Sequence, residues 1–503
     1  MRDGRRRMNR LFAAVLMCST AMLQAADPVA NHGPNVLFLM ADDLRAELAS
    51  YDSPAITPNL DRLAQMSVQF DRAYCQHAVC NPSRSSLLTG LRPDTLRVWN
   101  NGTHLREPNP DVMTLPLWFK DHGYSTRCVG KIFHNWHTKV HGDRRSWSAP
   151  EFLHYANHGD DVALVNGPLP PNLAQTTSGF GYAKTGICEC RDVPDDAYYD
   201  GRVATEAARV LSEVKDKPFF LAVGFWKPHA HFNAPKRYWD LYDRAQLPAL
   251  DPRRPEGAPD VAFHESSEVL GPIETQKLPT PDQAAEMRHG YFANISYMDA
   301  QLGKVLDALE HSGVADRTIV TFISDHGYHI GEHTLWGKTS NFELDARVPM
   351  MIHAPGVSMD GKRTTAIAEL VDLFPTLTAL CNLPSPAGLE GVSLEPVLRD
   401  PANSVKDAAF TQHPRPSHYY RVPSKRPDTM GVSIRTAHAR YTEWRDWTTG
   451  KTFARELYLD TDEPAETRSV IDQPHVANIQ RESERLLLAQ FPIVTHPRDS
   501  PEE

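Results

Sequence analysis

Long apolar runs, cysteine and positive charge are all scarce in this chain of 503 residues. Beyond the N-terminal segment, no apolar stretch approaches the roughly 20 residues that a membrane-spanning helix needs, so we expect no stable membrane insertion. Seven cysteines are too few for a disulfide framework. Cys75, Cys128 and the Cys188/Cys190 pair can still bond in an oxidising compartment, and the sequence leaves their pairing open. The formal net charge of -10 argues against a nucleic-acid partner, because phosphate-binding surfaces carry clusters of basic residues.

The N-terminal segment has the composition of a secretory signal peptide. Five arginines within residues 2–10 precede a mostly apolar run at 11–23, and the small residues Ala25 and Ala26 follow. This order is typical of a cleaved export signal, and the run is too short to span a bilayer. A lipid anchor at Cys18 is the weaker alternative, because Met17 stands where a lipoprotein signal needs a small residue. We therefore expect a signal peptide at 1–25 and a periplasmic or secreted mature protein.

Four apolar, β-rich runs end abruptly in polar residues. The runs are Val36–Met40, Thr126–Val129, Phe219–Phe225 and Thr318–Ile323. Continuous apolar runs are typical of strands buried on both faces of a mainly parallel sheet. Such sheets bind ligands beyond the carboxyl ends of their strands, so the polar groups that follow the four runs should converge. Helical patterns at 57–66, 114–122, 200–215, 284–311 and 369–379 alternate with the strands and predict an α/β sandwich.

The remaining segments suggest two insertions and a second, smaller unit. Residues 142–194 and 247–281 are rich in proline, glycine and aspartate, and we expect them to lie over the site and select the substrate. From about Pro384 the pattern changes to short strands at 431–435, 439–444 and 456–459, followed by a helix at 476–490. We therefore predict a domain at 26–383 and, at 384–503, a small antiparallel sheet with one helix.

One short stretch is the most informative part of the sequence. It runs from Cys80 through Pro82, Ser83 and Arg84 to Gly90 and predicts a short helix with proline in its first turn. Taken alone, it allows Cys80 to be a small buried apolar residue. The stretch nevertheless resembles the signature CxPSRxxxLTG of type I sulfatases, and every fixed position is present.

The resemblance implies a modified residue at position 80. In type I sulfatases a formylglycine-generating enzyme oxidises this cysteine to formylglycine, and the hydrated aldehyde attacks the sulfur of a sulfate ester. Cys80 would then be the precursor of the nucleophile, and the maturing enzyme would be a partner of the chain. Since the substrate is an anion and the net charge is negative, a local basic pocket must attract it.

Two acidic pairs stand at the ends of predicted strands. Asp42-Asp43 follows the first run and Asp325-His326 follows the last. Carboxylates brought together need a counter-charge, which a divalent cation supplies, and an oxygen-rich set suits Ca²⁺ although His326 is a softer ligand. For either pair alone a turn at a strand end or a helix cap is the favoured explanation, and the two pairs together with the cysteine signature reverse that preference. The family resemblance implies that all four residues, with residue 80, bind calcium.

Five basic residues complete the predicted site, and the resemblance implies a role for each. Arg84 would orient the nucleophile, and Lys131 and His134 would hold the aldehyde hydrate and remove its second proton. His229 and Lys338 would contact the sulfate and can protonate the leaving oxygen. Without the signature, a solvated lysine, a packed histidine and a structural His229 are ordinary alternatives.

The resemblance extends from the first strand to the last sheet and is strongest to the iduronate-2-sulfatase branch of the family. It rests on these motifs: 219–224 before Lys227-Pro228-His229, 324–327 before 331–333, Trp336, Lys338, 340–342, 348–349, 92–95, 433–436 and 456–458. It implies an alkaline-phosphatase-like sandwich with a large, mostly parallel sheet. It also implies an exo-acting enzyme that removes sulfate from a sulfated saccharide in glycosaminoglycan degradation. The 2-position of a uronic acid is a candidate for the sulfate that is removed. The sequence departs from the branch in both insertions, so the branch is better defined than the sugar.

Two other classes of protein remain as alternatives. A phosphatase or phosphonate hydrolase of the same superfamily would share the sheet and the metal site, but the related phosphatases use serine or threonine with two zinc ions. A non-catalytic protein that binds sulfated glycans would result if Cys80 were not converted. Intact mass detects the conversion, and aryl sulfate and aryl phosphate assays separate the two enzymes.

Overall fold

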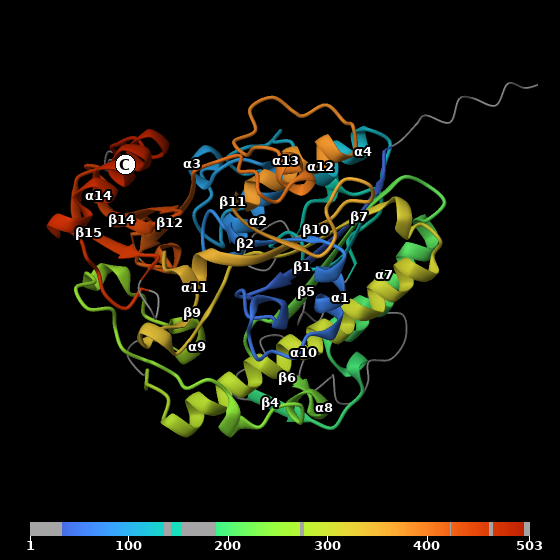
Figure 1. Ribbon diagram of the computed structural model, residues 1–503, viewed down its shortest axis with the longest axis horizontal. Coiled ribbons are helices and arrows are strands. Elements are labelled where there is room, and N and C mark those ends of the chain that lie inside the picture. Colours follow the sequence, from blue (N-terminus) through green and yellow to red (C-terminus); the bar gives the residue numbers. More distant parts are fainter. Residues whose placement is uncertain are drawn as a thin grey trace, which may run out of the picture. The chain divides into compact units, whose positions relative to one another are not determined.

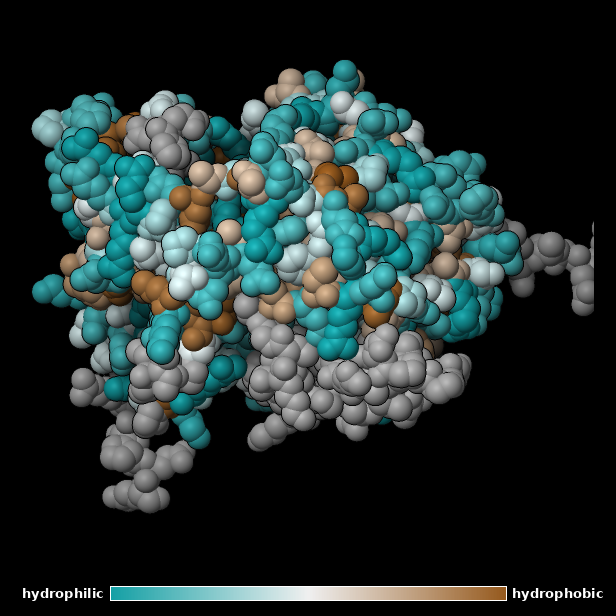
Figure 2. Space-filling model, turned by 90° about the horizontal axis from the view of Figure 1, so that it is seen from below, coloured by the Kyte–Doolittle hydropathy of each residue, from teal (hydrophilic) through white to brown (hydrophobic). Residues whose placement is uncertain are grey.

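The computed structural model describes residues 33–134, 142–152, 188–271, 276–422, 424–461 and 466–496. The predicted signal peptide and most of the first predicted insertion lie outside these residues. Within them, none of the helices combines the length and the apolar character that crossing a bilayer requires. The face in Figure 2 is mainly hydrophilic, with apolar residues in small separate groups.

A seven-stranded sheet organises the fold, in the order β11-β2-β10-β7-β1-β5-β3 (Figure 1). Its strands are β1 (Asn35–Asp42), β2 (Val68–Tyr74), β3 (Ser125–Gly130), β5 (Phe219–Pro228), β7 (Thr318–Ser324), β10 (Arg347–His353) and β11 (Lys362–Glu369). Strand β1 is parallel to β5 and β7, β5 is parallel to β3, and β11 is parallel to β2. Only β10 runs antiparallel to its neighbours β7 and β2. The prediction of a large, mostly parallel sheet is confirmed.

The four strands predicted from apolar runs are the four adjacent strands β7, β1, β5 and β3. Every residue of β1 is buried. Leu37 and Leu39 enter the core on one face of the sheet, while Val36, Phe38 and Met40 enter the core on the other. Because side chains alternate between the faces of a strand, a strand with a helical layer on both sides must be apolar throughout.

Helices cover both faces of the sheet (Figure 1). On one face lie α1 (Pro58–Gln65), α7 (Tyr199–Val214) and α10 (Pro281–His311). On the other lie α2 (Cys80–Thr89), α4 (Leu115–Asp121), α12 (Leu373–Leu380) and α13 (Glu395–Arg399). Helix α10 begins with a capping box in which Thr280 and Gln283 satisfy each other's backbone N–H groups, and Pro281 stands at its first position. The sheet with a layer of helices on each face is the predicted α/β sandwich.

A four-stranded antiparallel sheet follows toward the C-terminus. It consists of β12 (Ala408–Arg415), β13 (Thr429–Thr436), β14 (Ala439–Asp446) and β15 (Thr452–Leu459). Helix α14 (Ala477–Gln490) packs against it, with Leu487 in the same core as Ile434 and Tyr441. The small sheet with one helix is therefore confirmed, with β12 as an additional strand. The described residues from Gly33 onward form one unit, so a division at 383/384 stays a prediction.

The described cysteines are all unpaired. Cys75 and Cys128 are buried as free thiols. Cys188 and Cys190 lie two residues apart on β4 (Cys188–Arg191), so their side chains point to the same side of the strand, and both are free thiols. Among the described residues, none of the disulfides that the sequence left open is formed.

Candidate active site

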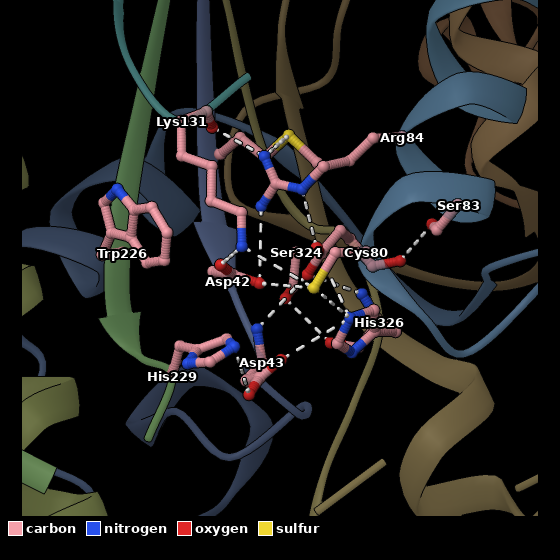
Figure 3. Close-up of polar contacts among 12 residues, drawn as sticks. Asp42, Asp43, Cys80, Ser83, Arg84, Lys131, Trp226, His229, Ser324 and His326 are labelled. Carbon is pink, nitrogen blue, oxygen red and sulfur yellow. Dashed lines mark hydrogen bonds and ion pairs between the residues drawn. The ribbon is translucent and has the colours of Figure 1, made fainter. Parts of the chain in front are cut away.

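The polar residues at the ends of four adjacent parallel strands converge on one point (Figure 3). Asp42 and Asp43 come from β1, Lys131 follows β3, His229 follows β5, and Asp325 with His326 follows β7. Helix α2 brings Cys80, its first residue, to the same point. The structure therefore brings these predicted site residues together at the sheet edge, from segments almost 300 residues apart.

Cys80 lies at the centre of this group and is 1% exposed. Its Sγ is 3.5 Å from Asp42 Oδ1, 3.6 Å from Lys131 Nζ and 3.4 Å from His326 Nε2. Burial raises the pKa of the Cys80 thiol, and the charge of Asp42 raises it further. A thiol held neutral in this way is a poor nucleophile, so Cys80 is poorly suited to thiolate chemistry.

Arg84, one helical turn beyond Cys80, is completely buried and binds the carboxylates from two strands. Its Nε donates to Asp325 Oδ2 at 2.8 Å, and its Nη2 lies 3.5 Å from Asp42 Oδ1. Its Nη1 donates to the carbonyl oxygens of Lys131 at 2.6 Å and Ile132 at 3.0 Å. Burial opposes the charged guanidinium, but Asp325 and Asp42 more than offset it and raise the pKa of Arg84. One rigid side chain thus fixes the relative positions of three strand ends.

Lys131 reaches Asp42 because two glycines let its backbone come close to β5. Its Nζ contacts Asp42 Oδ2 and lies 4.2 Å from the centroid of the Trp226 ring. A Cβ atom at Gly224 would lie 1.8 Å from the carbonyl oxygen of Lys131, and Gly130 has a φ of +80°. Burial raises the pKa of Asp42, but Lys131 and Arg84 outweigh it and hold the pKa well below its usual range.

Asp43 adopts a left-handed backbone conformation, with a φ of 62°. Successive residues of an extended strand face opposite sides, so this turn is what brings the carboxylates of Asp42 and Asp43 to the same site. The turn is held by hydrogen bonds from Asp43 N to Asp325 Oδ1 at 3.2 Å and from Leu44 N to Ser324 Oγ at 2.9 Å. Aspartate is among the few residues that tolerate this conformation.

A second charged group borders the first on its more open side. Lys338 Nζ is 2.9 Å from Asp43 Oδ1, 3.1 Å from His229 Nε2 and 2.6 Å from Glu268 Oε1. His229 Nε2 is in turn 3.2 Å from Glu268 Oε1. Burial lowers the pKa of His229, but Asp43 more than offsets it, and the pKa rises to about 10. His229 and Lys338 thus present positive charge beside the carboxylates.

Glu268 was not predicted as a site residue. It belongs to α9 (Ser267–Leu270) in the second insertion, which contains no periodic pattern and no strand end that could have pointed to it. Its contacts with His229 and Lys338 confirm that this insertion lies over the site.

The orientation of His326 suits a metal ligand. Its Nδ1 is 3.0 Å from the carbonyl oxygen of Gly327, which can only accept, so Nδ1 carries the proton. In the neutral imidazole this leaves the lone pair on Nε2, which points toward Cys80 Sγ and lies 3.5 Å from both Asp43 Oδ1 and Asp325 Oδ2.

Two overlapping sets of donor atoms can hold a metal ion. One contains Asp42, Asp43, Cys80 and His229, the other Asp42, Cys80, Asp325 and His326, and within each set the donor atoms lie within 4.8 Å of one another. All five predicted ligands therefore belong to this group. Three carboxylates with one correctly oriented imidazole fit a divalent cation, and the predominance of oxygen favours a hard one.

His134 is the predicted site residue that follows Lys131 on the same segment. It is buried three residues beyond Lys131, directly before residues 135–141, which lie outside the described part of the chain. Its role stays a prediction.

A mostly parallel α/β sandwich with a set of possible metal ligands at its strand ends defines an alkaline-phosphatase-like fold. Comparison with known proteins is more specific. The chain belongs to the sulfatase family, whose model matches residues 34–383, and a model described as N-sulphoglucosamine sulphohydrolase, C-terminal, matches residues 331–491. The chain is thus a sulfuric ester hydrolase, and the resemblance seen in its sequence is confirmed.

Individual relatives agree with this assignment. Iduronate 2-sulfatase from Mus musculus is 34% identical, over 87% of this chain and 90% of its own. Two solved structures at lower identity share the fold. Phosphonate monoester hydrolase from Silicibacter pomeroyi has a TM-score of 0.73 at 23% identity, covering 92% of this chain and 96% of its own. A protein solved in complex with its substrate D-glucosamine-2-N,6-O-disulfate has a TM-score of 0.71 at 21% identity, covering 91% and 97%.

Proposed function

We propose that this sulfatase removes sulfate from the end of a sulfated saccharide, at the 2-position of a uronic acid, with a formylglycine at residue 80 and one calcium ion. The observation that carries the proposal is the position of Cys80 Sγ, which lies within 3.6 Å of Asp42, Lys131 and His326. The side chain at 80 thus adjoins both the metal ligands and the basic groups. The similarity to iduronate 2-sulfatase supports the choice of sugar.

Formylglycine at residue 80 would supply the nucleophilic oxygen as its hydrated aldehyde, and a bound calcium ion would lower the pKa of that hydroxyl group. Asp42, Asp43, Asp325 and His326 would hold the calcium ion. Arg84 holds the carboxylates of Asp42 and Asp325 in fixed positions relative to each other, since its guanidinium binds both.

The basic residues carry out the remaining steps. Lys131 holds the side chain at residue 80 against Asp42, and His134 removes the second hydroxyl proton so that sulfate can leave and the aldehyde is restored. His229 and Lys338 bind the ester oxygens, neutralise the charge that develops there and donate a proton to the leaving oxygen. Both are held beside Asp43, which keeps them next to the metal ligands.

The experiment that tests this proposal measures both the mass of the peptide that contains residue 80 and the hydrolysis of an aryl sulfate. After co-expression with a formylglycine-generating enzyme, the peptide that contains residue 80 should lose the thiol-to-aldehyde mass difference, and the protein should hydrolyse an aryl sulfate. Cys80→Ala should abolish turnover and keep the fold. Cys381→Ala removes another buried thiol, at the end of α12, and should leave turnover near the wild-type rate.

Two outcomes would contradict the proposal. One is near-normal aryl sulfate turnover in Cys80→Ala, and the other is an unchanged mass of the residue-80 peptide in a fully active protein. Hydrolysis of aryl phosphate in preference to aryl sulfate would favour the phosphatase or phosphonate hydrolase alternative. Defined sulfated mono- and disaccharides then identify the sugar and the sulfate position.

We also propose that the enzyme acts in the periplasm or outside the cell. The arginine-rich start, the apolar run at 11–23 and the small residues after it support cleavage near Ala25. N-terminal sequencing of the protein from the periplasmic fraction or the medium should find a mature chain that begins near residue 26. An intact N-terminus in the cytoplasmic fraction would contradict export.

A further inference from the structure

The second insertion holds a carboxylate against the two cationic residues of the sulfate pocket. Glu268 lies on α9, and the hydrogen bond from Trp336 N to Ser266 Oγ at 2.9 Å ties that short helix to the strand that precedes Lys338. Glu268 lies two residues beyond Ser266, and Lys338 lies two residues beyond Trp336. The position of the carboxylate is therefore set by the fold of the site.

The Glu268 carboxylate bridges both cations at one oxygen. Its Oε1 is 2.6 Å from Lys338 Nζ and 3.2 Å from His229 Nε2. The same two nitrogens contact Asp43, at 2.9 Å and 3.7 Å. The side chain of Asp43 is completely buried, whereas that of Glu268 is 26% exposed. An ester that enters from solvent and contacts both cations therefore meets Glu268 first.

Glu268 carries a full negative charge. Burial raises the pKa of its carboxyl, but Lys338 and His229 lower it further, and the pKa lies well below its usual range. An ester oxygen that binds Lys338 and His229 would lie about two hydrogen-bond lengths from this carboxylate. At that distance, each additional negative charge on the ester is repelled strongly in a partly buried site.

We propose that Glu268 is a specificity-determining residue that selects a monoanionic sulfate ester over a dianionic phosphate monoester. A sulfate monoester carries one negative charge, and a phosphate monoester carries close to two at pH 8, because its second pKa is about 6. The inference rests on the proposed roles of His229 and Lys338 as contacts of the ester group. Specificity then comes from a repulsive element beside attractive ones.

The test compares esters that differ in charge and in central atom. Glu268→Gln keeps the size of the side chain and an oxygen that can accept from Lys338, and it removes the charge. At pH 8 we expect the ratio of kcat/KM for 4-nitrophenyl phosphate to that for 4-nitrophenyl sulfate to rise by at least about tenfold. The monoanionic ester 4-nitrophenyl phenylphosphonate should follow the sulfate. Glu268→Asp, which keeps the charge, should keep the wild-type ratio.

A matched control separates a local charge effect from a general one. Glu265→Gln removes the same charge three residues earlier in the insertion and should leave the phosphate-to-sulfate ratio unchanged. Equal losses for both esters in Glu268→Gln would overturn the proposal and leave Glu268 as a support for Lys338 and His229. A rise of the phosphonate ester together with the phosphate would also overturn it, because the discrimination would then depend on phosphorus and not on charge.

A binding measurement keeps the inference independent of turnover. Calorimetry with 4-nitrophenyl phosphate on Cys80→Ala and on Cys80→Ala/Glu268→Gln should show binding at least about tenfold tighter in the double variant. Unchanged affinity would overturn the role of Glu268 even if aryl sulfate hydrolysis is as proposed. Failure of the proposed function shows separately, as a wild-type protein that carries formylglycine but hydrolyses no sulfate ester.

Discussion

Asp42 is the carboxylate that both candidate sets of metal ligands share. It also neutralises Lys131 and Arg84, so a single completely buried side chain serves the metal and the two nearest cations. Such a group has no substitute in the site, because each neighbouring carboxylate is already held by another partner: Asp325 by Arg84, and Asp43 by Lys338.

Asp42→Asn should therefore lose the metal. We expect bound calcium to fall from about one per chain and its affinity to weaken at least about 100-fold, which is the upper end of the loss seen when only a hydrogen-bond partner of a metal ligand is changed. Inductively coupled plasma mass spectrometry of the dialysed, folded protein measures this. Asp372→Asn is the matched control, since Asp372 is an equally buried carboxylate that pairs with Lys406 at 2.7 Å; it should lose stability and keep its metal. Unchanged calcium in Asp42→Asn would show that the ligands are misassigned.

At the scale of single residues, the sequence was informative wherever a residue followed a recognisable strand or signature. Asp42, His229 and Asp325 each follow an apolar run within four residues, and parallel strands place such residues together. Glu268 could not be found in this way. Its proximity to Lys338 depends on a contact across 70 residues between a four-residue helix and a two-residue strand, β9 (Trp336–Gly337), and neither has a periodic pattern.

Among the elements, the contact between β5 and the segment after β3 positions the basic side of the site. Gly224 pairs with Gly130 in the parallel ladder, and Lys131 N donates to Gly224 O at 2.9 Å. A side chain at 224 has no room beside this hydrogen bond, because its Cβ would lie 1.8 Å from the carbonyl oxygen of Lys131.

Gly224→Ala should displace Lys131 from Cys80 and Asp42. We expect about 1–3 kcal/mol of lost stability from overpacking and a fall in kcat/KM of at least tenfold, because the backbone that carries Lys131 must move. Val223→Ala, one residue earlier in the same buried strand, should cost a similar amount of stability through a cavity and leave Lys131 in place. Urea unfolding and aryl sulfate kinetics are measured on both variants. If Gly224→Ala and Val223→Ala were equally stable and equally active, the role of Gly224 in positioning Lys131 would be refuted.

The second insertion should determine glycan preference more than chemistry. Exchange of residues 247–281 for the equivalent loop of a relative, with 266–270 retained so that Glu268 keeps its contacts, should change the ranking of sulfated disaccharides. Turnover of a small aryl sulfate should change less than about threefold, since no catalytic contact is removed. The readout is kcat/KM for a panel of defined disaccharides against one aryl sulfate. An unaltered ranking would mean that this loop does not contact the sugar.

The sequence predicted elements with continuous apolar character and missed those without it. Strand β1 reads as an unbroken apolar run because both faces are covered, and its prediction was confirmed within two residues at each end. Strands β2 and β11 carry Asp71, Arg72, Lys362 and Arg363 at partly or fully exposed positions, so their patterns do not differ from those of loops. Strand β12 contains Pro414, which argues against a strand by its missing N–H.

At the scale of the whole molecule, buried charge connects the small sheet to the catalytic one. Glu343, on α11 (Glu343–Ala346), accepts from Arg435 Nε at 3.1 Å and from Arg440 Nη2 at 2.5 Å, and these arginines belong to β13 and β14. Burial raises the pKa of Glu343, but Arg435 and Arg440 outweigh it and lower the pKa to about 2.

This pKa shift makes stability depend on pH in a defined direction. A carboxyl whose pKa is lower in the folded state stabilises the fold above its unfolded pKa, near 4.5, and loses that contribution as the pH falls toward 2. Glu343→Gln should therefore lower the free energy of unfolding by about 2–3 kcal/mol at pH 7 and by less at pH 3. Urea unfolding at both pH values measures the difference. The exposed Glu310→Gln should show little effect at either pH, and a pH-independent loss in Glu343→Gln would contradict the assignment.

The strand order also bears on how the chain reaches its final state. Strand β1 is the first strand of the fold, yet it lies between β5 and β7, pairing Val36 with Phe220 and Asn35 with Thr318. A chain that emerges from the ribosome or from a translocase N-terminus first therefore delivers its middle strand long before either neighbour. The sheet can close only after residue 318 of 503 has followed, which keeps the polypeptide open during synthesis and exposes an apolar segment to aggregation meanwhile.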